Sequence, residues 1–282
     1  MDKVKKIRLD VYLVENNFFT SREKARVAIM EGLIYVNNQK EDKPGTMIKE
    51  NSQVSYRGEK LKYVSRGGLK LEKAKDKFNI DFNDKLCADI GSSTGGFTDL
   101  MIQNGATKVF AIDSGTNQLD YSLRVNEKVE VFENTNARYL KLSDISDKKI
   151  DLVTIDVSFI SLTKILPVAK ALLKDNGEII MLIKPQFEAG RENVEKNGII
   201  KDIKIHNEVI YKIIEFSNSI GLDFVGLDFS PIKGPAGNIE FLLYEKLNES
   251  KIGNFNFDEK YFRDYIKSVV NNAHEELNKW KF

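Results

Sequence analysis

The 282-residue chain has very little cysteine and histidine, and it contains no long hydrophobic segment. Its single cysteine, Cys87, excludes an intramolecular disulfide and a cysteine-rich zinc site. No apolar run approaches the ~20 residues that a membrane-spanning helix requires, and the first residues lack the hydrophobic region of a signal peptide. A hydrophobic content of 41% is nevertheless enough to form buried cores. We therefore expect a cytoplasmic protein of about two domains that binds neither a metal nor a membrane.

Positive charge is concentrated at the start of the chain, although the formal net charge is only +1. Residues 1–75 contain 17 Lys and Arg against 10 Asp and Glu, a balance of +7, whereas residues 76–282 contain 26 against 32, a balance of −6. A basic segment joined to a mildly acidic body is typical of a polyanion-binding module attached to a second domain. A solvated lysine-rich surface would give the same counts, so charge alone leaves both interpretations open.

The local sequence of the basic segment predicts a small α+β domain. A short helix is expected from Leu9 to Glu15, and Ser21 is a good N-cap for a second helix, SREKARVAIME, which Gly32 ends. The runs LIYVN and QVSY are expected to be short strands. On the second helix Arg22 and Arg26 are spaced i, i+4, so they share one face. The alternative is an ordinary helical cap on a larger domain.

After the linker-like stretch GEKLKYVSRGG, buried strands alternate with amphipathic helices. The expected strands are KLCADI, KVFAID, IDLVTID, EIIMLIKP and GNIEFLLYEK. The expected helices are GGFTDLMIQNG, LTKILPVAKALLKDNG and IHNEVIYKIIEFSNSIG. This alternation predicts an α/β domain with a doubly wound, mostly parallel sheet.

The loop GSSTGG, which follows the first of these strands, fits two kinds of site. It contains G-x-S-x-G, which places a nucleophilic serine, here Ser93, on a tight turn in many hydrolases. That chemistry needs a histidine base, and His206 and His274 are expected on helix surfaces instead. Small residues also let the backbone approach a ligand closely at the carboxyl end of a parallel strand. Asp113, 22 residues after Gly91, would then bind ribose hydroxyls, so we favour a cofactor loop.

Six motifs resemble the TlyA/haemolysin-A family, in the order YVSRGGLKL, DIGSSTGGFTD, NTNARYL, DVSFISL, LIKPQFE and GNIEFLL. The resemblance spans about residues 7–247, and its first part is similar to the small RNA-binding module of ribosomal proteins and RNA-modifying enzymes. Family members are S-adenosylmethionine-dependent ribose 2′-O-methyltransferases of ribosomal RNA, related to the FtsJ methyltransferases. The resemblance therefore implies a Rossmann-like methyltransferase fold, S-adenosylmethionine as cofactor, and a cytidine of the ribosomal subunits as target. No DNA partner is expected.

The resemblance also implies the residues of the site. The Lys-Asp-Lys-Glu set of FtsJ-type chemistry is matched by Lys70, Asp156, Lys184 and Glu240. The residues expected to bind the cofactor are Asp89, Gly91, Ser93, Gly95, Gly96, Phe97, Asp113 and Asn136. The residues expected to contact RNA are Arg8, Arg22, Lys24, Arg26, Lys60, Lys62 and Arg66. Among these, Phe97 could instead pack the first helix of the sheet domain, Asn136 could be a turn residue, and Arg66 could brace the two domains.

The chemistry explains why lysines and carboxylates would be combined. A ribose hydroxyl is a weak nucleophile, so catalysis needs in-line positioning and removal of one proton. A lysine with a pKa near ~10.4 is less than about 0.1% neutral at pH 7; a neighbouring lysine and burial lower that pKa, while carboxylates raise it. We expect Lys184 to activate or orient the hydroxyl, steered by Asp156. Lys70 and Glu240 would position the ribose and balance charge.

The predicted domains are an RNA-binding domain (1–60), a linker (61–68), a methyltransferase domain (69–249) and a C-terminal helical extension (250–282). Methylation of an adenine amino group is disfavoured, because Lys-Pro-Gln-Phe stands where an N-P-P-Y-like loop would be. Carbon methylation of a pyrimidine needs a reactive cysteine, whereas Cys87 is expected inside a strand. Two other classes stay open: a non-catalytic RNA-binding or assembly factor, and a membrane-active haemolysin.

Overall fold

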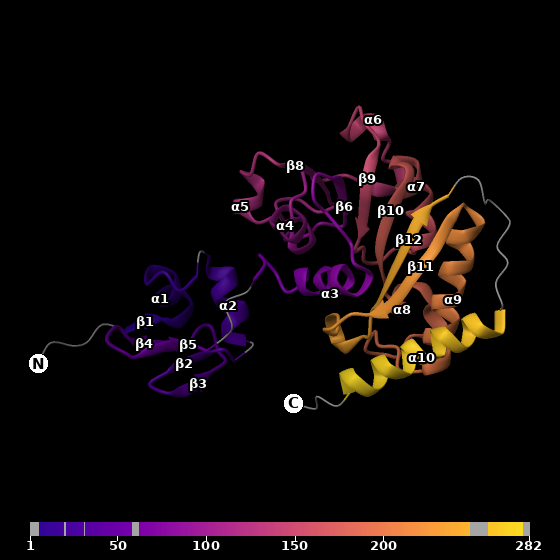
Figure 1. The fold of residues 1–282 in the computed structure, drawn as a ribbon. Coiled ribbons are helices and arrows are strands. Elements are labelled where there is room, and N and C mark those ends of the chain that lie inside the picture. The colour runs from indigo at the N-terminus through magenta and orange to yellow at the C-terminus, as the bar shows by residue number, and fades with distance from the viewer. Residues whose placement is uncertain (1–5, 20, 31, 58–61, 249–258, 279–282) are drawn as a thin grey trace, which may run out of the picture. The chain divides into compact units, whose positions relative to one another are not determined.

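The computed structural model describes residues 6–19, 21–30, 32–57, 62–248 and 259–278. The chain divides into two compact units, Met1–Leu61 and Lys62–Phe282, and each is described by itself (Figure 1). Lys60, one of the predicted RNA contacts, lies outside the described residues.

The first unit is a small α+β domain, as predicted. Its helices are α1 (Leu9–Glu15) and α2 (Arg22–Met30). The strands are β1 (Lys6–Arg8), β2 (Ile34–Val36), β3 (Gln39–Glu41), β4 (Met47–Lys49) and β5 (Val54–Tyr56). β1 pairs with β4, while β2 lies between β3 and β5, and all pairs are antiparallel. The helices share a core with the strands that contains Leu9, Leu13, Ala25, Ala28, Ile29, Ile34 and Ile48.

The second unit is built on a seven-stranded sheet with the order β11-β12-β10-β9-β6-β7-β8. Its strands are β6 (Leu86–Ile90), β7 (Lys108–Ile112), β8 (Val129–Phe132), β9 (Ile150–Ile155), β10 (Leu173–Ile183), β11 (Leu222–Phe229) and β12 (Phe241–Leu247). The strands from β10 to β8 run parallel, whereas β12 is antiparallel to both β10 and β11. The predicted doubly wound, mostly parallel sheet is therefore confirmed.

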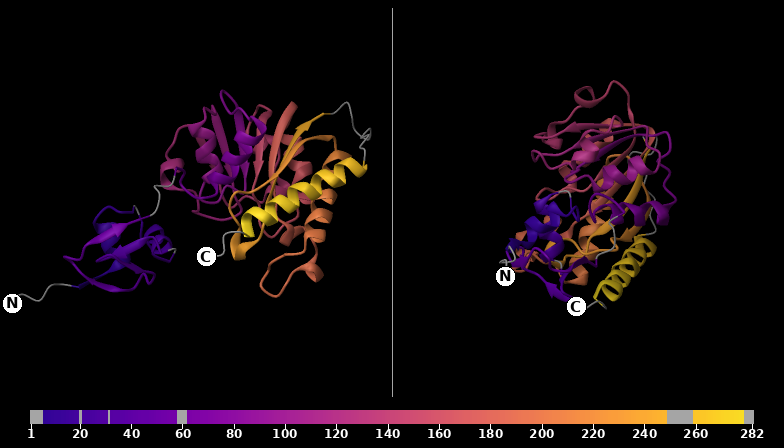
Figure 2. Two further views of the ribbon diagram at one scale, coloured as in Figure 1. Left: turned by 60° about the horizontal axis from the view of Figure 1, so that its bottom comes forward. Right: turned by 90° about the vertical axis from the view of Figure 1, so that its left-hand side faces the viewer.

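Helices cover both faces of this sheet (Figures 1 and 2). They are α3 (Gly68–Phe78), α4 (Gly96–Gln103), α5 (Tyr121–Arg124), α6 (Leu142–Ile145), α7 (Leu166–Leu172), α8 (Pro185–Glu188), α9 (Ile203–Ser219) and α10 (Glu259–Asn278). Alternate residues of β10 point to opposite faces. Ile180 and Leu182 pack with residues of α3 and α4, while Ile179 and Met181 pack with residues of α7, α9 and α10.

The helix α10, yellow in Figure 2, changes the environment of both histidines. It packs against α9 and β11 and buries Phe262, Ile266, Val270 and Ala273. His206, expected on a helix surface, is fully buried, and its Nδ1 lies 3.0 Å from His274 Nε2 on α10. Burial, followed by the nearby His274, lowers the pKa of His206 to about 4. The surface prediction for His206 was wrong because a helix distant in sequence covers that face of α9.

A buried carboxyl in β12 makes the stability of the second unit depend on pH. Burial raises the pKa of Glu245 to about 8; its Oε1 accepts a hydrogen bond from Ser217 Oγ (2.5 Å), and its Oε2 has no partner among the described residues. An unfolded glutamate has a pKa near ~4.3, so folding takes up a proton between those two values and stability falls as pH rises from about 4.3 to 8.

Glutamine is neutral, like the protonated carboxyl of Glu245. We therefore expect Glu245→Gln to stabilise the protein by roughly 2 kcal/mol at pH 7, with little effect at pH 4. Denaturant unfolding at several pH values measures the difference, and Glu215→Gln, an exposed position on α9, is the matched control. A difference between wild type and Glu245→Gln that does not grow with pH would contradict this prediction.

Candidate active site

Polar residues gather at one edge of the large sheet because of its topology. Asp156 follows β9 and Lys184 follows β10, so both lie at carboxyl ends of parallel strands. β12 runs antiparallel to β10, and its first residue, Phe241, pairs with Ile183 at the end of β10. The amino-terminal end of β12 therefore lies at the same edge, and Glu240 directly precedes it. Lys70 comes from the first turn of α3. The structure thus brings together the four residues that the family resemblance implied as a catalytic set.

These four side chains form a continuous chain of opposite charges. Lys70 Nζ lies 2.6 Å from Glu240 Oε2 and 3.7 Å from Asp156 Oδ2. Lys184 Nζ lies 2.5 Å from Asp156 Oδ1. Glu240 is fully buried, and both lysine side chains are more than nine-tenths buried. Such pairing is what permits four ionisable groups to be buried together.

The two lysines have different surroundings. Burial works against the charge of Lys70, but Asp156 and Glu240 outweigh it and hold the pKa of Lys70 above its ordinary value. Lys184 contacts one carboxylate, and its Nζ also donates to Ser158 Oγ at 3.0 Å. Lys70 is therefore a fixed cation between two carboxylates, whereas Lys184 combines one carboxylate with a neutral hydroxyl.

The glycine loop lies at the same edge, next to Asp156. β6 pairs with β9, and Ile90 O accepts a hydrogen bond from Asp156 N at 3.0 Å. Gly91, the first loop residue, has φ +85°, and a Cβ there would lie 2.4 Å from Asp156 O. Gly95 has φ +96° and precedes α4, which Gly96 begins. Only glycine satisfies both the backbone angle and the close approach at position 91.

Four further residues expected to bind the cofactor have different environments. Asp113, after β7, accepts hydrogen bonds from Ser93 N (2.8 Å) and Gly115 N (2.7 Å), so its carboxylate already organises the loop. Asp89 is fully buried; burial raises its pKa to about 6, and its oxygens accept from two threonine hydroxyls. Phe97 packs into the core, and Asn136 is exposed and caps a short helical turn.

The glycine loop yields a test of close packing at this edge. We expect Gly91→Ala to lower the affinity for S-adenosylmethionine at least about tenfold, because it combines left-handed strain of about 1–2 kcal/mol with a clash against the backbone of Asp156. Calorimetric titration measures this affinity. Gly198→Ala is the matched control, since Gly198 has φ +73° with nothing within 4 Å of an added Cβ. Equal affinities in the two variants would show that the close approach does not matter.

The residues expected to contact RNA lie in both units. Arg8 and Arg22 share a partner, because both donate to the buried carboxylate of Asp10. Lys24 and Arg26 are exposed on α2. Lys62 and Arg66 are exposed in the second unit, and Lys62 pairs with Glu72.

Two residues near Lys184 were missed by sequence reasoning. Ser158, in the segment after Asp156, accepts the hydrogen bond from Lys184, and Glu188 on α8 binds Ser161 and Leu162 of the same segment. Phe159, the residue after Ser158, is 90% exposed and has φ +63°. Ser158 lies inside the motif DVSFISL and Glu188 inside LIKPQFE, and these motifs gave the only signal available in the sequence.

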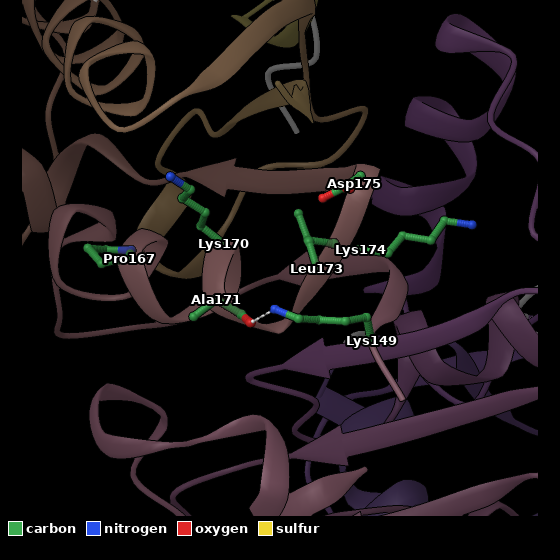
Figure 3. Close-up of a pocket in the computed structure, with 7 residues that line it drawn as sticks. All are labelled: Lys149, Pro167, Lys170, Ala171, Leu173, Lys174 and Asp175. Carbon is green, nitrogen blue, oxygen red and sulfur yellow. Dashed lines mark hydrogen bonds between the residues drawn. The ribbon is translucent and has the colours of Figure 1, made fainter. Parts of the chain in front are cut away.

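A separate hollow lies at the other end of the strands, between β10 and α7 (Figure 3). It is lined by Lys149, Pro167, Lys170, Ala171, Leu173, Lys174 and Asp175. Lys149 donates to Ala171 O at 2.7 Å, and Lys174 pairs with Asp151, so these two charges are engaged within the fold.

Over the described ranges, no group of three or more potential metal ligands occurs and no helix is long and apolar enough to cross a membrane.

The sheet order, the glycine loop at its carboxyl edge and the acidic residue after β7 define a Rossmann-like methyltransferase. Comparison with known families agrees: the FtsJ-like methyltransferase family matches residues 63–247, and the S4 domain matches residues 7–54. The chain belongs to the FtsJ-like methyltransferase family and has an N-terminal S4 domain.

Several known proteins are similar to this chain over most of its length. The "Putative rRNA methyltransferase YqxC" of Bacillus subtilis is 48% identical and covers 98% of this chain and 97% of its own. The "16S/23S rRNA (cytidine-2'-O)-methyltransferase TlyA" of Mycobacterium tuberculosis is 34% identical over 85% of this chain and 90% of its own. A solved structure, "Putative hemolysin from Streptococcus thermophilus", has 44% identity and a TM-score of 0.77 over 98% of both chains. The resemblance to the TlyA/haemolysin-A family is therefore confirmed.

Proposed function

We propose that this protein transfers the methyl group of S-adenosylmethionine to a ribose 2′-oxygen of ribosomal RNA, with a cytidine of the ribosomal subunits as acceptor. The observation that carries the proposal is the convergence of Lys70, Asp156, Lys184 and Glu240 at the sheet edge that also holds the glycine loop. The names of the relatives in Bacillus subtilis and Mycobacterium tuberculosis support ribosomal RNA, and the second supports cytidine.

The glycine loop fits the cofactor. Gly91 and Gly95 adopt positive φ, and Ser93 and Asp113 hold the loop in shape through the hydrogen bond from Ser93 N. The proposal assigns cofactor contacts to this loop, to the start of α4 and to the carboxylate of Asp113, which suits ribose hydroxyls. S-adenosylmethionine, when bound, supplies an electrophilic methyl group.

The residues of the chain then have to orient the ribose hydroxyl and remove its proton. Lys184 suits proton removal better than Lys70, because Lys70 is fixed as a cation by two carboxylates. In the proposal Lys184 Nζ accepts the proton from the 2′-oxygen, while Asp156 holds Lys184 in place. Lys70, fixed by Glu240, provides a positive charge next to the developing oxyanion.

The first unit supplies the basic surface for RNA. Arg22 and Arg26 lie on one face of α2, and Arg8 lies beside Arg22 through their common partner Asp10. Contacts of this kind recognise phosphates and RNA shape more than base identity. We assign RNA binding to residues 1–60, chemistry to residues 69–249, and the site of action to the cytoplasm, where ribosomal subunits are available.

Methyl transfer to unmodified ribosomal subunits tests the function. The two subunits are incubated separately with methyl-labelled S-adenosylmethionine, and the RNA is digested to nucleosides. Label in 2′-O-methylcytidine is the expected result. Label on a base, or no label while the protein binds S-adenosylmethionine, would contradict the proposal; the second outcome would favour the non-catalytic RNA-binding alternative.

A further inference from the structure

The amine of Lys184 makes one ion pair and one hydrogen bond. Asp156 Oδ1 lies 2.5 Å from Nζ as the ion-pair partner, and Ser158 Oγ accepts a hydrogen bond from Nζ at 3.0 Å. A lysine ammonium has three donor positions, so neither contact uses up the capacity of the amine. Because the side chain of Lys184 is only 8% exposed, these two contacts restrict the orientation of its amine.

Ser158 lies on the open side of this cluster. It is an exposed residue two positions after Asp156, in the segment that leaves β9. The next residue, Phe159, has φ +63°, a conformation that costs energy for a bulky side chain. Such a conformation persists when contacts from the surrounding structure hold it.

Glu188 provides that attachment. Its Oε1 accepts a hydrogen bond from Leu162 N at 2.7 Å, and its Oε2 accepts one from Ser161 Oγ at 2.6 Å. Glu188 ends α8, the helix that begins directly after Lys184. Segment 157–162 is therefore tied to the short helix that directly follows Lys184, which limits how far Ser158 and Lys184 can move apart.

We propose that Ser158 is a positioning residue for Lys184, and that Glu188 maintains it in that role by holding segment 157–162 on α8. The inference rests on the proposed function, in which the proton of the ribose 2′-hydroxyl moves to Lys184 Nζ. In the neutral amine, the hydrogen bond to Ser158 Oγ and the contact with Asp156 orient the N–H groups, and the lone pair is left for the ribose hydroxyl. After proton transfer the ammonium has the same two partners within reach.

A serine that positions Lys184 and a serine that binds substrate affect different kinetic constants. Ser158→Ala leaves Lys184 with Asp156 alone, so the lone pair samples other directions and kcat falls about tenfold, while KM for the subunits and the affinity for S-adenosylmethionine stay the same.

The experiment compares four variants of the full chain with wild type in kcat and KM. Ser158→Thr keeps the hydroxyl and is expected to retain most of kcat. Glu188→Gln is expected to lower kcat in the same direction as Ser158→Ala, and Ser143→Ala, at an exposed serine of α6, is the unaffected control. Ser158→Ala within twofold of wild type, Ser158→Thr as slow as Ser158→Ala, or a change in KM alone would overturn the inference.

Failure of the inference can be distinguished from failure of the proposed function. If wild type yields 2′-O-methylcytidine and Ser158→Ala does so at the same rate, only the inference is wrong. If wild type forms no ribose-methylated product, the function is wrong whatever Ser158 does.

Discussion

Replacing Lys184 with alanine is expected to lower kcat for ribose methylation about 10³-fold and to leave the affinity for S-adenosylmethionine within about twofold of wild type. The polar partners of Lys184 Nζ are Asp156 and Ser158, and neither belongs to the glycine loop. The loss should therefore appear in the chemical step alone. Single-turnover methyl transfer measures the rate, and calorimetric titration measures cofactor binding.

Two further substitutions at this position separate a proton acceptor from a positive charge. Lys184→Arg keeps the cation beside Asp156, but arginine does not lose its proton at accessible pH. If Lys184 accepts the proton, Lys184→Arg is nearly as slow as Lys184→Ala. Lys184→Met keeps the packing of the aliphatic stem, so it guards against a folding defect. Lys170→Ala, in the hollow at the opposite end of the strands, is the control. Activity of Lys184→Arg within tenfold of wild type would assign Lys184 an electrostatic role.

The strands that carry the site were predictable because they are continuous apolar runs. KLCADI, IDLVTID and EIIMLIKP correspond to β6, β9 and β10, and their carboxyl ends place Gly91, Asp156 and Lys184 at one edge. Strands with weaker patterns were missed. β8 has only four residues, one of them the charged Glu130, and β11 is interrupted by a glycine, Gly226, where the pairing register shifts.

The helix before β10 was predicted too long for a related reason. The expected helix ran to residue 177, whereas α7 ends at Leu172 and β10 begins at Leu173. Residues 174–177 are Lys-Asp-Asn-Gly, and Asn176 has φ +58°. The register of β10 against β9 shifts between Leu173 and Glu178, so the irregular part of the strand has no sequence periodicity to reveal it.

The convergence of the four charged residues could be expected only through the family resemblance. Lys70 and Glu240 are separated by 170 positions, and no local pattern relates them. Their 2.6 Å contact depends on β12 running antiparallel to β10 and on α3 packing against β12 and β11. The contact of Ser158 with Lys184 likewise joins residues 26 positions apart, and it lies next to a left-handed residue, Phe159, whose conformation the sequence does not favour.

The buried carboxylate of Asp10 gives the second large expected effect, in the S4 domain. Arg8 donates to both of its oxygens at 3.0 and 2.9 Å, and Arg22 donates to Oδ2 at 2.8 Å. The arginine side chains are about half exposed, at 49% and 52%, so they are held by Asp10 and still reach solvent. This arrangement fixes two candidate phosphate contacts at low entropic cost.

The pH dependence of this cluster follows from the pKa of Asp10. The hydrogen bond from Arg8 is the largest cause, and together with Arg22 it lowers that pKa to about 2 against the opposing effect of burial. Because an unfolded aspartate has a pKa near ~3.9, the cluster stabilises the S4 domain fully above about pH 4 and loses this contribution as pH falls towards 2. Asp10→Asn is therefore expected to destabilise the domain by about 2 kcal/mol at pH 7 and by much less at pH 2.

RNA affinity gives the sharper test of Asp10. The added positive charge predicts tighter binding to RNA, whereas the lost orientation of the arginines predicts weaker binding. Asp10→Asn makes the S4 domain more positive by one unit, which by charge alone strengthens binding to RNA. If Asp10 positions Arg8 and Arg22, the variant instead binds ribosomal RNA about tenfold more weakly, because both guanidinium groups lose their fixed orientation. Asp42→Asn, at an exposed position of the same unit, changes the charge equally and is expected to bind as tightly as wild type or slightly tighter. Filter binding compares wild type, Asp10→Asn and Asp42→Asn at 10 °C and pH 7, where Asp10→Asn remains folded. If Asp10→Asn and Asp42→Asn bind RNA with equal affinity, the arginines bind RNA without help from Asp10.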